Sequence, residues 1–564
     1  MTQRTGYPSI DRPWLKYYSE EAINATLPEC TMYEYIWQNN REHLSDIALR
    51  YYGAKISYGQ LFDSIKRAAA AFRAMGVKAG DIVTIMSMHT PETIAAIYGL
   101  NYLGAVANLV YMTLSPKEIV GTLDNTGSKL LLILDAAVEK LDEIKAEIAV
   151  PVVVLGVSDS MPTAMKLGYK LKARPPKHEY MTWKAFLARG DASALPEPAN
   201  DHAAPAVIVY TSGTTGEPKG VVLNGDNLNS VAEQLCRTDR NYQRQDTVLM
   251  ILPPFIIFGA SMIHLGLYNG MDVILCIQLD NDAIGKLFDQ YKPKRYVAGP
   301  MYLEGLIKHV KGDMSGVVDI TGGGDSITPE QEETFNAFLK AHGSPTHYMT
   351  GYGMSEVSAA VVLNLACANR KGSLGVPLPQ TNVKLCDPET RREVPFGEVG
   401  EICFHTPGVM QGYYKNEAAT AECVEYDDDG RKWLHTGDLG CMDEDGFLFF
   451  KGRIKRIYMI LGSDGFAYKL FPQRIEEYLE EQEEIKMAAV IVREDAEVLH
   501  TAHAFVVLEP TVEDADAYLE RLQGKMLRDV PEHLRPASIR PVSALPSTPS
   551  GKIDYRALEA LAGK

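Results

Sequence analysis

The 564-residue sequence lacks the features that mark membrane proteins, secreted proteins and nucleic-acid binders. No apolar run approaches the length needed to span a bilayer, and the amino terminus has no apolar signal region. The formal net charge is -17, whereas a protein that binds nucleic acid presents a basic face. These absences predict a cytoplasmic protein with no integral membrane span and no nucleic-acid partner.

Cysteine is not arranged for disulfides or metals. The eight cysteines form no Cys-x-x-Cys pair and no Cys/His cluster with zinc spacing. Several of them lie in apolar runs, which is typical of reduced thiols in a core. We therefore expect reduced core thiols rather than a metal or redox site.

What the sequence does contain is an alternation of strand and helix patterns. A chain of this length exceeds what one core holds, so we expect two or more domains. The alternation predicts an α/β fold whose parallel sheets are covered by helices on both faces. The predicted elements are a hairpin at 51–58, helices at 59–75, 91–103 and 263–268, and strands at 81–86, 107–110, 130–134, 206–210, 247–252 and 273–277.

The character of the sequence changes toward the carboxyl end. Residues 372–401 and 412–450 have the short strands and Asp/Gly turns of a β-rich subdomain. From Lys451 onward, a basic stretch gives way to apolar and helical patterns that fit a small α+β domain of about a hundred residues. We predict a large N-terminal domain, residues 1–454, and a small C-terminal domain, residues 455–564.

Residues 161–177 combine basic and apolar side chains. A basic amphipathic stretch can lie on a membrane or guide an acidic ligand. Because the stretch is short and Pro175-Pro176 interrupts it, a solvated connector is the preferred interpretation. Its basic residues are Lys166, Lys170, Lys172, Arg174 and Lys177, and its large apolar residues are Met165, Leu167 and Leu171.

The most informative stretch is residues 210–220, which reads Tyr-Thr-Ser-Gly-Thr-Thr-Gly-Glu-Pro-Lys-Gly between two apolar runs. Glycines let backbone N–H groups surround an anion, the hydroxyls add donors, and Lys219 adds a positive charge. The stretch differs from a Walker A loop, because Lys219 follows Pro218 and precedes Gly220. It predicts a phosphate-binding loop, with a Ser/Thr/Gly-rich surface turn as the alternative.

Two further stretches suit the other parts of a nucleotide. Residues 348–356 place an aromatic between glycines, followed by a hydroxyl and an acid, which can serve a base, a phosphate and Mg²⁺. Residues 433–440 hold Asp438 in a glycine turn, where a carboxylate can accept hydrogen bonds from both ribose hydroxyls. Three glycines at 322–324 end a predicted strand and leave room for a flat ligand, although a helix-entry turn explains them equally well.

Together with residues 451–455 and 546–554, these stretches resemble five motifs of the adenylate-forming superfamily, in its order and at about its spacing. That superfamily includes acyl-CoA synthetases, adenylation domains of peptide synthetases and beetle luciferases. Residues 372–377 and 411–414 also look like its connecting segments, so the resemblance covers nearly the whole chain.

The resemblance implies a reaction in two halves. A carboxylate attacks the α-phosphate of ATP to give acyl-AMP and pyrophosphate, and a thiol, commonly coenzyme A, then displaces AMP. The substrates supply nucleophile and leaving group, so the protein aligns them and neutralises charge. ATP, Mg²⁺ and coenzyme A are the implied cofactors, and a small carboxylic acid is the implied partner. The oligomeric state stays open, with a homodimer among the options.

The resemblance also implies roles for individual residues. Lys552 is the implied catalytic lysine, carried on a mobile lid formed by the C-terminal domain, and Lys455 is the implied hinge. Glu356 is the implied magnesium ligand, and Lys219 joins Lys552 and Glu356 as a catalytic residue. The implied nucleotide-binding residues are Thr211, Ser212, Gly213, Thr214, Thr215, Gly216 and Lys219 for the β- and γ-phosphates, Gly323, Gly324, Asp325, Tyr352 and Gly353 around adenine, Ser355 and Lys552 at the α-phosphate, and Asp438 and Arg453 at the ribose.

Three positions depart from the superfamily's commonest pattern. Ser355 replaces a threonine and keeps the hydroxyl. Ile256 replaces a frequent aromatic or histidine, which makes the implied acyl pocket of Phe255, Ile256 and Met354 apolar and more open. Arg456 replaces an acid that commonly follows the hinge, which bears on the geometry of the thioester step.

Four alternatives accompany the leading hypothesis of an acyl-CoA synthetase for a fatty or aromatic acid. An amino-acid-activating ligase is disfavoured, because Phe255-Ile256 offers no acid to pair with a buried ammonium. A ligase with a carrier-protein acceptor and a luciferase-type oxygenase share the first half-reaction and stay open. A catalytically silent nucleotide-binding regulator is disfavoured, because it has no need of Lys552 and Glu356.

Overall fold

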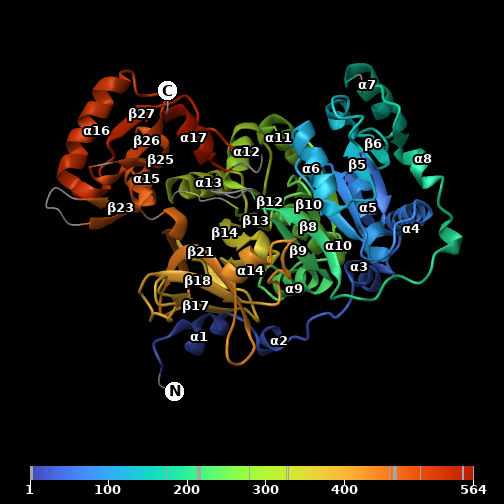
Figure 1. The fold of residues 1–564 in the computed structure, drawn as a ribbon, viewed down its shortest axis with the longest axis horizontal. Coiled ribbons are helices and arrows are strands. Elements are labelled where there is room, and N and C mark those ends of the chain that lie inside the picture. The colour runs from blue at the N-terminus through green and yellow to red at the C-terminus, as the bar shows by residue number, and fades with distance from the viewer. Residues whose placement is uncertain are drawn as a thin grey trace.

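The structure is a computed structural model that describes residues 4–562 except 174–175, 212–217, 279, 325–326, 328, 457, 462–466, 496 and 549–551. Two large sheets, a smaller antiparallel sheet and a C-terminal α+β unit make up the molecule (Figure 1). The C-terminal unit, drawn in red and dark orange, lies on the opposite side of the molecule from the blue N-terminal sheet (Figure 1).

The first large sheet has eight strands in the order β19-β9-β8-β4-β3-β5-β6-β7. The strands from β8 to β7 are parallel, whereas β9 and β19 add an antiparallel edge. Buried strands such as β5 and β6 are wholly apolar, as expected for parallel strands covered on both faces. The bounds are β3 Ile82–Met86, β4 Val106–Leu109, β5 Leu131–Leu134, β6 Val152–Leu155, β7 Met181–Thr182, β8 Pro205–Tyr210, β9 Gly220–Asn224 and β19 Gly412–Tyr413.

The second large sheet has nine strands in the order β16-β15-β14-β13-β12-β10-β11-β1-β2. Its strands from β14 to β1 are parallel, and antiparallel strands form both edges. The predicted α/β class is thus confirmed, with mixed rather than purely parallel sheets. The bounds are β1 Ile47–Tyr51, β2 Ala54–Ser57, β10 Thr247–Met250, β11 Asp272–Leu275, β12 Arg295–Ala298, β13 Asp319–Gly322, β14 Tyr348–Met354, β15 Ala359–Leu363 and β16 Val376–Pro377.

Helices cover these sheets, and the sequence shows why they begin where they do. A capping box of Ser57 and Gln60 starts α4, and every residue of α5 is buried. Helix α10 begins at Ile257, earlier than the predicted 263, because its wholly apolar sequence hides the helical period. The bounds are α1 Pro8–Asp11, α2 Glu20–Ile23, α3 Met32–Asn40, α4 Tyr58–Ala74, α5 Pro91–Tyr102, α6 Pro116–Thr126, α7 Thr163–Ala173, α8 Trp183–Leu187, α9 Gly225–Cys236, α10 Ile257–Tyr268, α11 Asn281–Tyr291, α12 Leu303–His309, α13 Pro329–Ala341 and α14 Glu417–Cys423.

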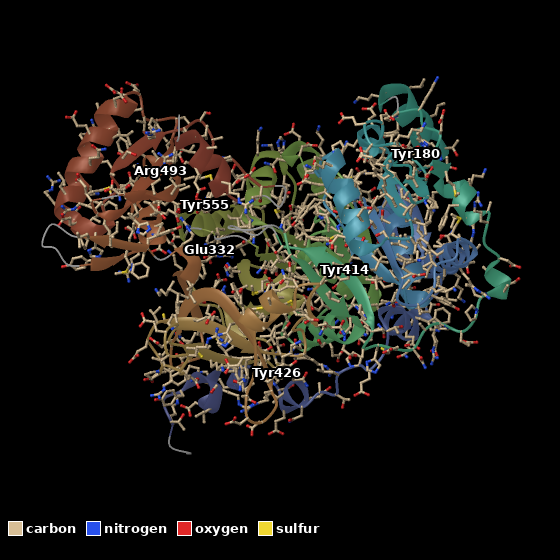
Figure 2. All side chains as sticks on the ribbon, in the orientation of Figure 1. Tyr180, Glu332, Tyr414, Tyr426, Arg493 and Tyr555 are labelled. Atoms are coloured by element: carbon tan, nitrogen blue, oxygen red, sulfur yellow. The ribbon has the colours of Figure 1, made fainter. Side chains whose placement is uncertain are left out.

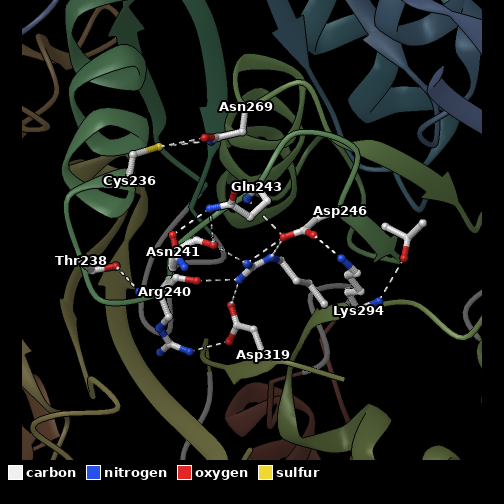
Figure 3. Close-up of polar contacts among 11 residues, drawn as sticks. Cys236, Thr238, Arg240, Asn241, Gln243, Asp246, Asn269, Lys294 and Asp319 are labelled. Carbon is white, nitrogen blue, oxygen red and sulfur yellow. Dashed lines mark hydrogen bonds and ion pairs between the residues drawn. The ribbon is translucent and has the colours of Figure 1, made fainter. Parts of the chain in front are cut away.

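Buried ion pairs tie together the amino ends of three neighbouring strands (Figure 3). Asp319 at the start of β13 pairs with Arg240 and, at 3.4 Å, with Arg295 at the start of β12. Arg295 also pairs at 2.8 Å with Asp246, which precedes β10. Since parallel strands share a direction, this cluster lies at the edge of the sheet opposite the carboxyl ends, from which the predicted nucleotide residues extend.

A five-stranded antiparallel sheet and the C-terminal unit complete the chain. The antiparallel sheet matches the predicted β-rich region and contains β17 Asn382–Cys386, β18 Gly400–His405, β20 Val424–Tyr426, β21 Lys432–Met442 and β22 Leu448–Arg453. The C-terminal unit has its own apolar core, which includes Leu470, Val490 and Leu522. Its elements are β23 Tyr458–Leu461, β24 Ala467–Leu470, α15 Pro472–Glu480, β25 Ile485–Asp495, β26 Leu499–Leu508, α16 Ala515–Asp529, β27 Ser538–Pro541 and α17 Tyr555–Ala562.

The basic stretch at 161–177, expected to be a solvated connector, lies between β6 and β7 and is a helix over most of its length. Helix α7 spans Thr163–Ala173 and ends before Pro175-Pro176. Proline disfavours helix in the residue that precedes it, so it limits where this helix ends and not whether it forms. The described residues include no helix with the length and apolarity needed to cross a bilayer. All eight cysteines are free, and only Cys367 is exposed.

Candidate active site

Strands β8 and β9 form the hairpin that carries the predicted phosphate loop. Its last paired residues are Tyr210 and Gly220. Beyond them, the N–H of Thr211 donates to the carbonyl of Lys219 at 3.0 Å, and the N–H of Lys219 donates to the Thr211 hydroxyl at 3.4 Å. These two hydrogen bonds close the loop at its base. The other predicted phosphate-binding residues, Ser212, Gly213, Thr214, Thr215 and Gly216, lie outside the described residues.

One tyrosine joins the predicted metal ligand to the predicted phosphate lysine. Tyr413, in the segment that pairs with β9, donates its hydroxyl to Glu356 Oε1 at 2.7 Å. The Nζ of Lys219 lies 4.8 Å from the centre of the Tyr413 ring. Burial, and next the charge of Glu356, raise the pKa of Tyr413, which keeps the hydroxyl as a donor. Tyr413 was not among the predicted site residues; it lies in the connecting segment 411–414, where the aromatic residue after Gly412 was the available signal.

A second group brings the predicted adenine and ribose residues together. Tyr352 donates its hydroxyl to Asp438 Oδ2 at 2.6 Å, and the Nε of Arg453 lies 3.1 Å from Asp438 Oδ1. The antiparallel register of β21 and β22 sets Asp438 opposite Arg453. Asp438 is buried, and burial followed by its charge raises the pKa of Tyr352. Three predicted residues from separate motifs therefore meet at one carboxylate.

Buried side chains behind Asp438 hold its loop in shape. Glu401 accepts a hydrogen bond from the Gly437 N–H at 2.9 Å through Oε1 and lies 2.8 Å from His435 Nδ1 through Oε2. The other ring nitrogen of His435 lies 2.7 Å from Glu425. Burial alone would lower the pKa of His435, but the two carboxylates outweigh it and raise that pKa. Glu401, Cys403 and His435 have metal-ligand spacing, yet both His435 nitrogens are already engaged, so we assign these residues to bracing the loop.

The glycines of the predicted adenine site are required by close packing or by backbone conformation. A Cβ on Gly323 would lie 2.9 Å from the carbonyl oxygen of Gly351. A Cβ on Gly353 would lie 1.4 Å from the carbonyl oxygen of Ala359, so the pairing of β14 with β15 alone demands glycine there. Gly324 has a φ of +88°, in the region that favours glycine. Asp325 lies outside the described residues, and Ser355 is partly exposed in the turn after β14.

The predicted acyl pocket lies where β10 leads into α10. Phe255 is buried, and its ring centre lies 5.1 Å from that of Tyr111. Ile256 directly precedes α10, and Met354 ends β14; both are half-buried against the main apolar core. No charged residue occurs in the sequence from Leu252 to Gly259, which is consistent with an apolar ligand.

The joint between the antiparallel sheet and the C-terminal unit lies between two arginines with partners on opposite sides. Arg453 contacts Asp438 in the antiparallel sheet, as described above. Arg456 contacts Glu476 of α15 at 2.8 Å and the Tyr555 hydroxyl at 3.0 Å, both in the C-terminal unit. Tyr555 lies on the side of that unit that faces the rest of the molecule (Figure 2). Lys455 stands between the two arginines in a short 3-10 turn, Ile454–Arg456.

The predicted catalytic lysine lies in a hairpin-like loop of the C-terminal unit. The N–H of Lys552 donates to the Thr548 hydroxyl at 3.2 Å, and the N–H of Thr548 donates to the Lys552 carbonyl at 2.7 Å. Ser547 pairs with Ile553 on either side. Lys552 therefore lies in a loop of the C-terminal unit, whereas Lys219 and Glu356 lie on the N-terminal side of the joint.

Comparison with known families matches two parts of the chain. A model of AMP-binding enzymes matches residues 36–414, and a model of the AMP-binding enzyme C-terminal domain matches residues 474–552. The chain belongs to the AMP-binding enzyme family. This AMP-binding enzyme lies in the acid–CoA ligase branch of the adenylate-forming superfamily, as the motifs predicted.

Known proteins of similar length are related in sequence or similar in fold to this AMP-binding enzyme. It is 27% identical to a long-chain-fatty-acid–CoA ligase of Bacillus subtilis over 97% of both chains. It is 28% identical to 4-coumarate–CoA ligase 3 of Oryza sativa subsp. japonica, over 90% of this chain and 87% of that one. Its fold is similar to that of ATP-bound MatB from Rhodopseudomonas palustris, with a TM-score of 0.80 at 21% identity over 94% of this chain and 98% of that one.

Proposed function

We propose that this enzyme joins an apolar carboxylic acid, fatty or aromatic, to coenzyme A through an acyl-AMP. Membership of the AMP-forming acid–CoA ligases supports ATP-dependent acyl-AMP formation. The acid is the finer part of the proposal. Support for it comes from the uncharged Leu252–Gly259 segment and from relatives that act on a long-chain fatty acid or on 4-coumarate.

The observation that carries the proposal is the convergence of Tyr352 and Arg453 on Asp438. A carboxylate offers about four lone-pair directions, so two remain for the ribose hydroxyls after these contacts. Tyr352 and Arg453 would fix the direction of the carboxylate, which orients the nucleotide before any chemistry occurs. The brace from Glu401 through the Gly437 N–H fixes the same loop from behind.

Glu356 fits the expected magnesium ligand by its chemistry. Its carboxylate is buried, and the hydrogen bond found for it in the described part of the chain, from Tyr413, uses only Oε1. The second oxygen is therefore available for a hard cation, which prefers oxygen ligands. A bound magnesium ion supplies charge neutralisation for the phosphates. Lys219, whose Nζ lies over the ring of Tyr413, would add positive charge at the same phosphates.

We further propose that the C-terminal domain begins at residue 455 and turns about Lys455. Arg453 is paired on the N-terminal side and Arg456 on the C-terminal side. A rotation between the two domains would therefore change the backbone dihedral angles of the residues between these arginines. Such a turn would bring Lys552 to the carboxylate and α-phosphate for the first half-reaction and remove it for the second.

The test is a panel of acids with ATP and Mg²⁺, followed by pyrophosphate release with and without coenzyme A. Fatty acids of increasing length and aryl acids form the panel, with amino acids as the contrasting set. We expect AMP and acyl-CoA from apolar acids only when coenzyme A is present. Pyrophosphate release without a thioester would point to a carrier-protein acceptor or to oxygenation, and no release with any acid would support a regulator.

A matched pair of variants connects the panel to the site. Asp438→Asn keeps the shape of the side chain but removes the charge that receives Tyr352 and Arg453, so the KM for ATP should rise by more than tenfold. Tyr413→Phe keeps the ring near Lys219 and removes only the hydrogen bond to Glu356. It should weaken the dependence on Mg²⁺ with little effect on the KM for the acid. Unchanged ATP kinetics in Asp438→Asn would contradict the assignment of the ribose site.

A further inference from the structure

Helix α7 turns large apolar side chains outward. Leu171 is 71% exposed, Leu167 is 64% exposed and Met165 is 49% exposed. Ala164 and Gly168 are exposed as well, and their spacing with Leu167 and Leu171 puts all four on one face of the helix. Figure 1 shows α7 at the periphery of the molecule, on the side away from the C-terminal domain. This apolar face, Ala164-Leu167-Gly168-Leu171, is not explained by the chemistry of the active site.

The other side of α7 is anchored, so the apolar face has a fixed direction. Tyr169 packs against the main core of the N-terminal domain, and Lys166 Nζ lies 3.7 Å from Asp159 Oδ1. The loop before the helix is held in turn, because Ser160 donates to Glu92 at 2.5 Å. This helix therefore presents large apolar residues to solvent, where a surface helix ordinarily presents polar ones.

Positive charge accompanies the apolar face along the sequence, although the whole chain has a net charge of -17. Lys172 and Lys177 are exposed, and neither has an ion pair among the described residues. The sequence adds Lys170 within the helix and Arg174 just beyond it. A helix with apolar residues on one face and lysines beside them matches the pattern that binds in the interface of an anionic bilayer.

We propose that α7 binds the surface of an anionic lipid bilayer, with Leu167 and Leu171 inserted at the boundary between headgroups and acyl chains. The lysines would contact lipid phosphates, as charge complementarity requires. A bilayer fits better than a protein partner, since a stable protein interface buries at least about 1,200 Å² and this face offers only a few side chains. The inference goes beyond the proposed ligase activity and does not depend on it.

The test uses the full-length protein and sedimentation with two kinds of vesicle. We expect binding to vesicles of phosphatidylcholine mixed with phosphatidylglycerol and little binding to phosphatidylcholine alone. The binding should weaken with added salt, which screens exposed charges. Lys172→Gln with Lys177→Gln should weaken it about thirtyfold, because each lysine near an anionic surface contributes about a factor of five. Leu167→Gln with Leu171→Gln should abolish measurable binding.

Leu527→Gln is the matched control, because Leu527 is 63% exposed but lies on α16 in the C-terminal domain. It should bind the mixed vesicles as the unmodified protein does. All these side chains are exposed, so the thermal midpoint of each variant should stay unchanged, and a midpoint check separates loss of binding from loss of folding. Failure of the unmodified protein to bind the mixed vesicles would overturn the proposal. So would equal binding by the Leu167/Leu171 variant, or a dimer in solution that this variant dissociates.

Discussion

Replacing Arg456 with methionine should destabilise the C-terminal domain at its base. The guanidinium of Arg456 donates to Glu476 through both terminal nitrogens, at 3.2 and 2.8 Å. It also donates to the Tyr555 hydroxyl at 3.0 Å and to the Val490 carbonyl at 2.8 Å. Burial alone would lower the pKa of Arg456, but Glu476 outweighs burial and raises that pKa. The side chain is therefore the charged centre of a network among β25, α15 and α17.

The size of the expected loss of stability follows from the buried charge of Glu476, which the substitution leaves without its partner. Removing one partner of a buried ion pair costs about 3–5 kcal/mol, because the other charge stays buried without compensation. Glu476 would keep the Val490 N–H at 2.7 Å and the Tyr555 hydroxyl at 3.1 Å. We therefore expect the lower end, about 3 kcal/mol. For a domain of about a hundred residues, this loss should lower the thermal midpoint by more than about 10 °C.

Calorimetry of the full chain is the assay, since domains with separate cores give separable transitions. Arg493→Met is the matched control: Arg493 is an arginine of the same domain whose hydrogen bond, to the Glu559 carbonyl, is long at 3.4 Å. It should move the midpoint by little. Arg456→Met combined with Glu476→Leu should cost less than the sum of the two single changes, because no unpaired charge remains. A loss of stability in Arg456→Met no larger than that in Arg493→Met, or an additive double variant, would contradict this prediction.

Four further predictions test the site and the fold. Lys552→Ala should reduce adenylation by orders of magnitude while thioester formation from supplied acyl-AMP falls much less; equal losses in single-turnover assays of both halves would contradict its role. Lys455→Pro should stop thioester formation and spare adenylation, and an unimpaired second step would remove it as the hinge. Asp319→Ala leaves two buried arginines without this partner, so the free energy of unfolding of the N-terminal domain, measured in urea, should fall by about 3–5 kcal/mol. A loss below about 1 kcal/mol would show that the cluster is dispensable. Burial raises the pKa of Glu92 from 4.5 to about 7, so between these pH values the native state holds a proton that the unfolded state has lost. The free energy of unfolding should therefore fall by about 3 kcal/mol as pH rises through this window. Glu92→Gln should remove this slope in unfolding titrations, and an unchanged slope would refute the assignment.

The local parts of the fold were predictable because local patterns determine them. The apolar run at 81–86 is β3, Ile82–Met86, and the amphipathic stretch at 59–75 is α4, Tyr58–Ala74. The uniform apolarity of α10 hid its start, because a helix that is buried all round has no polar face to mark its period. Helix α7 was missed for the opposite reason, since its apolar face meets solvent and not a core.

The candidate site was predictable in its residue types and not in its contacts. The motifs named Tyr352, Asp438 and Glu356, but their partners are distant in sequence: Tyr352 and Asp438 are 86 residues apart, and Tyr413 and Glu356 are 57 apart. Such pairings depend on how three sheets close around one another. No periodicity or spacing within a single stretch contains that information, so the aromatic residue after Gly412 was a signal whose partners, Glu356 and Lys219, emerged only from the fold.

Arg456 illustrates how a departure from a familiar pattern becomes intelligible only in three dimensions. An acid commonly follows the hinge in this superfamily, and an arginine there would reverse the local charge if nothing else changed. In this chain Glu476 of α15 lies against that arginine, so the positive charge after the hinge is paired within the C-terminal unit. Because Arg453 and Arg456 are both fixed by carboxylates on opposite sides, the backbone at Ile454 and Lys455 is what remains free to change its dihedral angles. The same two ion pairs that hold each domain together at this point therefore confine the proposed rotation to a single short turn.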